Sequence, residues 1–520
     1  LKEDLLYVGT DDGLIHVSEN AGVNWNKYDN FKGIPENTYV NSLVASKHKP
    51  ERVYAVFNNH KKGDFLPYVM VSNDRGKTWT SIVSNLPKRG SVYDIAEDHQ
   101  NENLLFVGTE FGVFFTYNSG KEWKQLKNGL PTVAIRDIEI QERENDLVLA
   151  TFGRSFYVLD NYSSLRQLKQ KINTKAHIFP IKKSLMYIDS RPLGNRGKGS
   201  QGESHFTAKN PPLGAVIKYF FNDTLKTQKQ IRQALENKKI KSKEDIEYPT
   251  LKQLKLEDKE EKPYLLFTIY DSDDNEIRKI IESPKLGLNE LVWNFRLTPQ
   301  TNISLKTSQP GRYSEASNGP LALPGKYFIS MHKLVNGKST MMVDKTPFNC
   351  SWLNDLSTPT ENKEELLAFQ VKVDRLRKAI DASGEVIDKD KKRLKFIKAA
   401  IKSYPNLDIT LLETVSRLED SIDGINIFLY GDPSLSSRDI EQKESIASKI
   451  GIIIWNMWRS RSNPTMTNKK LYQTASSDFE NLITEIQELD NSIKEIEEYL
   501  EKNEVPFTPG RGLILKWKKE

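Results

Sequence analysis

The amino-acid sequence predicts a multidomain protein that is mainly β at its start and helical at its end. Three observations support this order. A turn motif recurs three times within residues 1–162, short strand patterns follow one another in residues 211–357, and apolar residues repeat at three- and four-residue spacing in residues 358–503. Together they indicate a partial β-propeller, a β-sandwich and an antiparallel helical bundle.

The turn motif is clearest in residues 72–79, which read Ser-Asn-Asp-Arg-Gly-Lys-Thr-Trp. Its acidic or amide residue is placed to accept backbone N–H bonds, its glycine suits a positive φ, and its tryptophan buries a large ring beneath the turn, between neighbouring sheets. The motif therefore has a structural explanation that needs no substrate. The repeated positions are Ser18, Asn20, Gly22 and Trp25; Ser72, Asp74, Gly76 and Trp79; and Thr116, Asn118, Gly120 and Trp123.

The spacing of the motif predicts propeller blades. The three copies begin at residues 18, 72 and 116, which are 54 and 44 residues apart, close to the length of a four-stranded blade. About three full blades and a last blade without the turn, ending near Asp160, can be counted. Because propellers typically contain four to eight blades, we expect this sequence to begin inside a propeller whose earlier blades it does not contain. A closed ring of four blades is the alternative.

Residues 163–210 are expected to form a connector. Their Gly-rich, basic part, residues 190–200, has Gly199 after Lys198 where a phosphate-binding loop has Ser or Thr. This departure favours a surface loop.

Residues 211–357 show the short alternating strands of a fibronectin-like or immunoglobulin-like sandwich. We expect residues 264–270 to pair with 276–281, and residues 325–334 to pair with 338–343 across an Asn-Gly turn. The acidic turn between the first pair is explained by a solvated hairpin as well as by calcium. A charged helical insertion is expected at residues 225–256.

Residues 358–503 are predicted to be helical, and an extended tail at residues 504–520 is expected to pack back on another domain because it is rich in apolar side chains. Proline residues separate the helices, which is typical of bundle connections. The expected helices cover residues 361–382, 387–401, 409–429, 436–461 and 468–502.

Composition argues against several classes of site and partner. The 520 residues include 76 basic and 70 acidic side chains, and the net charge of +6 shows no bias toward nucleic acid. No apolar run is long enough to cross a bilayer. Cys350 is the only cysteine and the seven histidines are scattered, so we expect no metal site and no cofactor.

The turn of residues 72–79 resembles the Asp-box, or bacterial neuraminidase repeat, of sialidases, xyloglucan-cleaving glycosidases and sortilin-type receptors. The whole order of the chain, including residues 210–215 at the start of the sandwich and 505–511 near the end, resembles that of large exported bacterial proteins. These carry labels such as "glycosyl hydrolase" or "sortilin N-terminal domain". The resemblance implies a sortilin-like propeller, an extracytoplasmic location at the cell surface or outside the cell, and no established reaction.

Catalytic residues are hard to find in the propeller part. The arginine triad and Tyr–Glu pair of a sialidase cannot be assembled from it. For a glycoside hydrolase with a site between two propellers, Asp94 and Asp137 are the only acids at comparable strand starts. A role in starting a strand or capping a turn is the simpler explanation of both.

The sequence therefore predicts a non-catalytic envelope protein that acts as a protein-interaction scaffold or as an accessory subunit of a cell-surface complex. The alternative is a glycoside hydrolase. The expected partner is another protein, such as an outer-membrane or cell-surface component.

Overall fold

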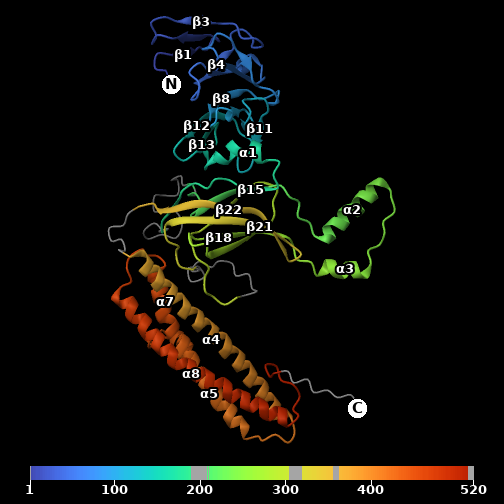
Figure 1. The fold of residues 1–520 in the computed structure, drawn as a ribbon, viewed down its shortest axis with the longest axis vertical. Helices are drawn as coiled ribbons and strands as arrows, with labels where there is room; N and C mark the ends of the chain where they lie inside the picture. Colours follow the sequence, from blue (N-terminus) through green and yellow to red (C-terminus); the bar gives the residue numbers. More distant parts are fainter. Residues whose placement is uncertain (1, 189–207, 209, 304–318, 355–361, 513–520) are drawn as a thin grey trace. The chain divides into compact units, whose positions relative to one another are not determined.

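The computed structural model describes residues 2–188, 208, 210–303, 319–354 and 362–512. The Gly-rich part of the expected connector and the last eight residues of the expected tail lie outside this described part. The chain divides into two compact units, and each is considered by itself (Figure 1). The first unit contains residues 1–180, 218–224 and 284–290; the second contains residues 181–217, 225–283 and 291–520.

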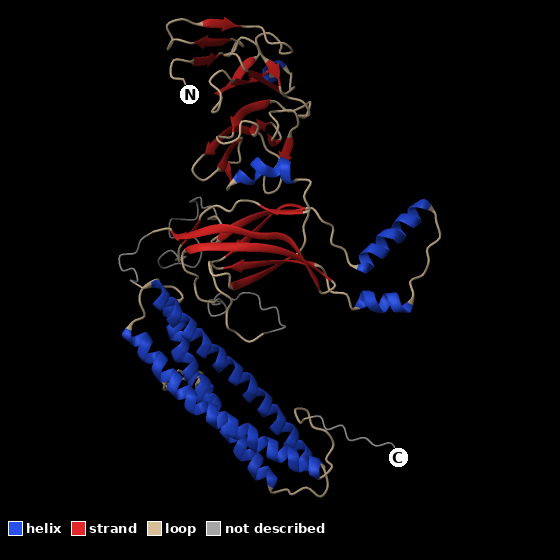
Figure 2. Ribbon diagram, viewed as in Figure 1, coloured by secondary structure: helices blue, strands red, loops and turns tan. Residues whose placement is uncertain are grey.

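The first unit contains four small antiparallel sheets that follow one another in chain order (Figures 1 and 2). Each sheet is formed by consecutive strands joined by hairpins, which is how a propeller blade is built. The first sheet is β1 (Leu6–Gly9), β2 (Ile15–Ser18) and β3 (Asn26–Tyr28); the second is β4 (Tyr39–Ala45), β5 (Val53–Asn58), β6 (Tyr68–Ser72) and β7 (Thr80–Ser81). The third is β8 (Val92–Glu97), β9 (Leu105–Thr109), β10 (Gly112–Thr116) and β11 (Lys124–Leu126); the fourth is β12 (Ile135–Gln141), β13 (Asp146–Thr151) and β14 (Phe156–Leu159).

Three apolar cores hold these sheets together, one for each neighbouring pair. Val17 and Phe57 belong to the core between the first and second sheets, and Val107 to the core between the second and third. Phe115 and Leu149 belong to the core between the third and fourth. Face-to-face packing of successive small sheets is the arrangement of a partial propeller, as the turn motif predicted.

The fourth sheet differs from the second and third because it has three strands and β14 lies at its edge. The chain then enters a 3-10 turn, η2 (Tyr162–Ser164), and a short helix, α1 (Leu165–Lys171). Tyr162 and Leu165 are buried in the core of the third and fourth sheets. The first unit thus extends past the boundary expected at residue 162, because Leu165, which lies beyond it, is buried in that core.

The second unit contains a five-stranded sheet in the order β16-β22-β21-β18-β19. The two strand pairings expected in this region are confirmed, β18 with β19 and β21 with β22. The strand β16 pairs parallel with β22 and comes from the segment expected to be a connector. The bounds are β16 (Ser184–Met186), β18 (Tyr264–Tyr270), β19 (Glu276–Glu282), β21 (Gly325–Val335) and β22 (Lys338–Trp352).

A separate three-stranded sheet has the order β15-β17-β20. The strands of this middle region form a β half-barrel, so the expectation of a β domain between propeller and helices is confirmed, while its immunoglobulin-like topology stays a prediction. The charged insertion is helical as expected. The bounds are β15 (Ala176–Ile178), β17 (Ala215–Phe221), β20 (Gly287–Trp293), α2 (Gln228–Ser242) and α3 (Leu251–Asp258).

The C-terminal helices pack around one long apolar core. The two helices expected at residues 361–382 and 387–401 are one continuous helix in the structure, α4, because Gly384 between them lowers helix propensity without breaking the backbone hydrogen bonds. No described helix combines the length and the apolar character that a membrane span requires. The helices are α4 (Lys363–Ser403), α5 (Leu411–Tyr430), α6 (Pro433–Ser436), α7 (Ile446–Met457) and α8 (Met466–Lys502).

One buried arginine links α4 to α8. The Arg393 guanidinium donates to Glu497 at 2.9 and 2.7 Å and to Asp390 at 2.7 Å, and it also contacts Asp490. Because burying an unpaired charge is costly, this network fixes how the two helices align along their apolar faces.

Candidate functional site

The three motif turns have the hydrogen bonds that their residue types predict. In the second copy, Asp74 Oδ1 accepts from the Thr78 backbone N–H at 2.8 Å, and Ser72 Oγ accepts from the Gly76 N–H at 2.8 Å. The amide residues replace the aspartate in the other copies: Asn20 accepts from Asn24 N at 2.8 Å, and Asn118 from Glu122 N at 3.0 Å.

Two of the three motif tryptophans, Trp79 and Trp123, lie toward the preceding sheet. Trp123 of the third sheet is 3% exposed in the core shared with the second sheet, and Trp79 of the second meets Phe31 edge-on at 5.8 Å between ring centres. Trp25 does not follow the expectation of burial, because it is 42% exposed. It belongs to the first sheet, so no earlier sheet of the described residues covers it.

Hydrogen bonds fix Trp123 in its slot between two sheets. The indole Nε1–H donates to the Ile82 carbonyl at 2.8 Å. Asn85 accepts from the Trp123 N–H at 2.6 Å and donates to its carbonyl at 3.0 Å. This tryptophan therefore fills an apolar slot and satisfies the polar groups at its edge.

The two candidate acids, Asp94 and Asp137, occupy equivalent positions. The first strands of the second, third and fourth sheets each contain a β-bulge, and Ser42, Asp94 and Asp137 are the residues that follow it. A bulge re-aims the following side chain, so all three positions are set by the same backbone irregularity. Asp94 and Asp137 also line one common cavity of about 240 Å³.

Asp94 joins three sheets. One carboxylate oxygen accepts from Ser42 Oγ of the second sheet at 2.6 Å, and the other accepts from the Ile138 N–H of the fourth at 2.8 Å. Burial raises the pKa of Asp94 to about 6, against the lowering effect of these hydrogen bonds and with a smaller raising effect from Asp137. Both oxygens of Asp94 are therefore engaged in contacts between sheets.

Asp137 has a different environment. Its side chain is exposed and lines the same cavity. The structure thus brings together a buried carboxyl of raised pKa and an exposed carboxylate, the asymmetry that acid–base catalysis uses. The sequence named this pair but did not indicate Ser42 and Ile138, whose contacts with Asp94 depend on how the sheets stack.

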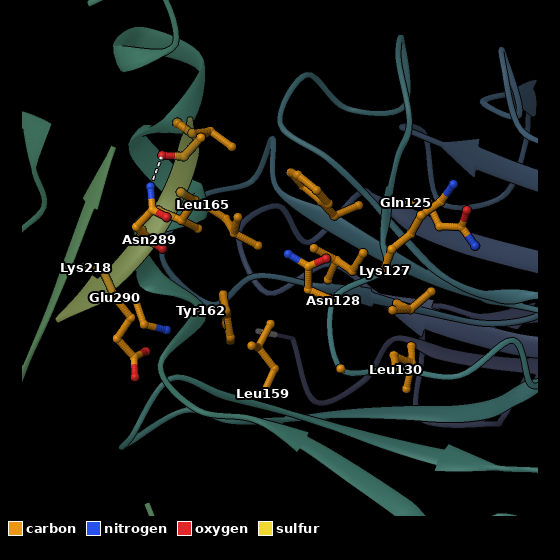
Figure 3. A pocket seen from close by; sticks show the side chains of 18 of the residues that line it. Gln125, Lys127, Asn128, Leu130, Leu159, Tyr162, Leu165, Lys218, Asn289 and Glu290 are labelled. Carbon is orange, nitrogen blue, oxygen red and sulfur yellow. Dashed lines mark hydrogen bonds between the residues drawn. The ribbon is translucent and has the colours of Figure 1, made fainter. Parts of the chain in front are cut away.

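A larger cavity of about 730 Å³ lies between the third and fourth sheets (Figure 3). Leu130, Leu159, Tyr162 and Leu165 surround it. Polar side chains lie toward its two ends: Gln125, Lys127 and Asn128 at one, and Lys218, Asn289 and Glu290 at the other. An apolar space with polar groups at its ends is typical of a binding site.

Lys218 lies at one end of this cavity. Its ammonium donates to the carbonyls of Asp160 and Asn161 at 2.7 Å each. Burial lowers the pKa of Lys218. This cavity could not be located from the sequence, although the last blade's lack of the turn motif was a signal of it.

No metal site accompanies either cavity in the described part of the chain, where no three His, Cys, Asp or Glu side chains gather as possible ligands.

Comparisons with known proteins show distant likeness of structure. No protein-family model matches the sequence, and no curated protein matches it. Among solved structures, YCF48 bound to a D1 peptide matches 31% of this chain and 49% of its own, at 14% identity and a TM-score of 0.25. A GH74 xyloglucanase from Xanthomonas campestris matches 30% of this chain and 26% of its own, at 14% identity and a TM-score of 0.25.

An ancestral GH74 enzyme matches a longer part, 69% of this chain and 41% of its own, at 13% identity and a TM-score of 0.26. The matched part covers less than half of each of these solved chains. The TM-scores are low, so the description as a partial propeller rests on this chain's own sheets and the cores between them.

Proposed function

We propose that this protein is a non-catalytic, protein-binding scaffold of the bacterial cell envelope, or an accessory subunit of a cell-surface complex. The observation that carries the proposal is the cavity between the third and fourth sheets. It is lined mainly by aliphatic and aromatic side chains, and its charged groups stand at its ends. Such a surface favours binding through apolar contact and offers little for chemistry.

The state of Asp94 also supports a scaffold. A carboxyl that accepts hydrogen bonds from two neighbouring sheets stabilises their stacking, and protonating a substrate would require it to leave those contacts. The envelope location rests on the resemblance of the chain order to that of large exported bacterial proteins.

The test is affinity isolation of the tagged protein from cross-linked envelopes, with a paired variant. We expect a partner at fixed stoichiometry that is lost with Leu130→Arg, which places a charge at the cavity. It should be retained with Leu66→Arg, a change at an exposed apolar residue elsewhere in the same unit. Equal recovery from both variants would contradict the assignment of this cavity as the binding site.

A glycoside hydrolase is the second candidate, and one observation favours it. Asp94 has a pKa raised to about 6 and shares a cavity with Asp137, as an acid and a second carboxylate would. Release of reducing ends from a β-glucan by the purified protein, abolished by both Asp94→Asn and Asp137→Asn, would establish this alternative and defeat the scaffold.

A further inference from the structure

The large cavity between the third and fourth sheets lies at the position that Trp123 fills between the second and third sheets. Positions 44 residues apart are equivalent in the second and third sheets, as Trp79 and Trp123 are. By this offset, Leu126 and Leu130 correspond to Ile82 and Leu86, and Val113 and Phe115 correspond to Val69 and Val71. The earlier set surrounds Trp123, whereas the later set lines the cavity.

In the described residues the fourth sheet supplies no tryptophan for this place, which is filled only in part: Tyr162 and Leu165 pack in one core with Val113 and Phe115, and a cavity remains beside them. The last strand of the fourth sheet, β14, leads directly into η2 and α1, without the Asp-box turn, the tryptophan or the fourth strand that follow β10 in the third sheet. The side chains of η2 and α1 cover one wall and leave about 730 Å³. The cavity is the slot of a tryptophan that the fourth sheet does not supply.

The outer edge of β14, which pairs with no other strand among the described residues, lies beside this slot. The carbonyl of Ser155 accepts from Thr151 N, so Ser155 faces β13. Because backbone groups alternate along a strand, those of Phe156 and Val158 point away from β13. Asp160 follows in the same alternation, and its carbonyl accepts from Lys218. The outer edge of β14 therefore offers the backbone groups of two residues, Phe156 and Val158, for pairing with another strand. The next outward carbonyl, that of Asp160, is bonded to Lys218.

We propose that this site binds an extended segment of a partner protein, which adds a fourth strand to β14 and inserts a tryptophan into the slot. The strand would pair with Phe156 and Val158, as β11 pairs with β10. The indole N–H would donate to the carbonyl of Leu126, the equivalent of the Ile82 carbonyl that accepts from Trp123. This inference rests on the proposed scaffold function and names the chemistry of its partner.

The probe is a fluorescent synthetic peptide that copies residues 116–128 of this protein, which contain the turn, Trp123 and β11. We expect saturable binding to the full chain by fluorescence anisotropy. The same peptide with Trp123→Ala should bind at least about tenfold more weakly, since a buried tryptophan is commonly the strongest contact of an interface. Equal affinities of the two peptides would overturn the proposal.

Two changes test where the peptide binds. Val158→Pro removes an outward N–H of β14 and should weaken binding at least about tenfold, whereas Val158→Thr keeps it and should not. Leu130→Trp fills the slot and should weaken binding similarly, with Leu130→Met as the matched control. Unchanged affinity in both Val158→Pro and Leu130→Trp would overturn the proposal.

A measurement without protein variants guards against misfolding. N-methylation of the peptide amides that face β14 should abolish binding if a strand forms, and binding that survives it would overturn strand addition. Dimerisation of the protein that is lost in Trp25→Ala would identify a second copy as the occupant and overturn the assignment to a partner.

The outcome separates this inference from the scaffold proposal. If the peptide fails to bind while the envelope partner is still lost with Leu130→Arg, strand addition is wrong and the scaffold stands. If no partner depends on Leu130, the scaffold site itself is wrong, whatever the peptide does.

Discussion

The last two interfaces between sheets of the first unit differ at equivalent positions: one is filled by a tryptophan side chain and the other contains a cavity. Between the second and third sheets, Trp123 fills the slot and its indole N–H is paired with the Ile82 carbonyl. Between the third and fourth sheets, the equivalent positions line a cavity. The comparison shows that a repeated fold keeps a cavity where one repeat omits its turn, because the preceding sheet still presents the surface that the turn would cover.

The largest expected effect is the loss of the side chain that fills the slot. Trp123→Ala should destabilise the third sheet by about 3–5 kcal/mol, since a buried aromatic ring leaves a cavity. Hydrogen exchange of peptides from β9 and β10 measures the free energy of opening. The control is Trp25→Ala, which removes a 42% exposed ring and should cost less than about 1 kcal/mol. Similar losses in both would contradict the filled-slot interpretation.

The carboxyl that joins the sheets should give a pH dependence of a definite sign. Since burial raises the pKa of Asp94 from 3.8 to about 6, the folded state binds its proton more tightly than the unfolded state. The wild-type free energy of opening, minus that of Asp94→Asn, should fall by about 2–3 kcal/mol as pH rises from about 4 to about 6, and stay level above. A difference that is constant or rises with pH would show that Asp94 is ionised without penalty.

The smallest expected effect is the difference in destabilisation between alanine substitutions at two glycines of positive φ. Gly120→Ala, at φ 84°, would bring a Cβ within 2.7 Å of Ile82 Cβ in the filled interface, and should cost about 2–3 kcal/mol from strain and crowding. Gly153→Ala, at φ 75° with open space around it, should cost only about 1 kcal/mol of strain. Hydrogen exchange of the two hairpins reports both, and equal costs would indicate that the third sheet can shift away from the second.

Local sequence patterns predicted much of this fold. The motif turns could be recognised because their hydrogen bonds join residues at most four positions apart, as between Ser72 and Gly76. The pairing of β18 with β19 and of β21 with β22 followed from alternation and turn residues. The helices followed from the spacing of their apolar residues, although the break expected between residues 382 and 387 does not occur in α4.

The sites were harder to predict because they depend on contacts between sheets. Asp94 was named as a candidate acid, yet its partners Ser42 and Ile138 are 52 and 44 residues away along the chain. The burial of Trp123 and the exposure of Trp25 come from one motif, so the motif alone could not distinguish them.

The sequence by itself determined the turns, the strand pairs and the order of β and α regions, because these depend on hydrogen bonds and apolar spacing within a few residues or between adjacent strands. Only the tertiary structure decided which tryptophan is covered, why Asp94 holds its proton more tightly, and where a cavity remains. Each of these depends on what one sheet places against its neighbour, and burial is a property of that contact.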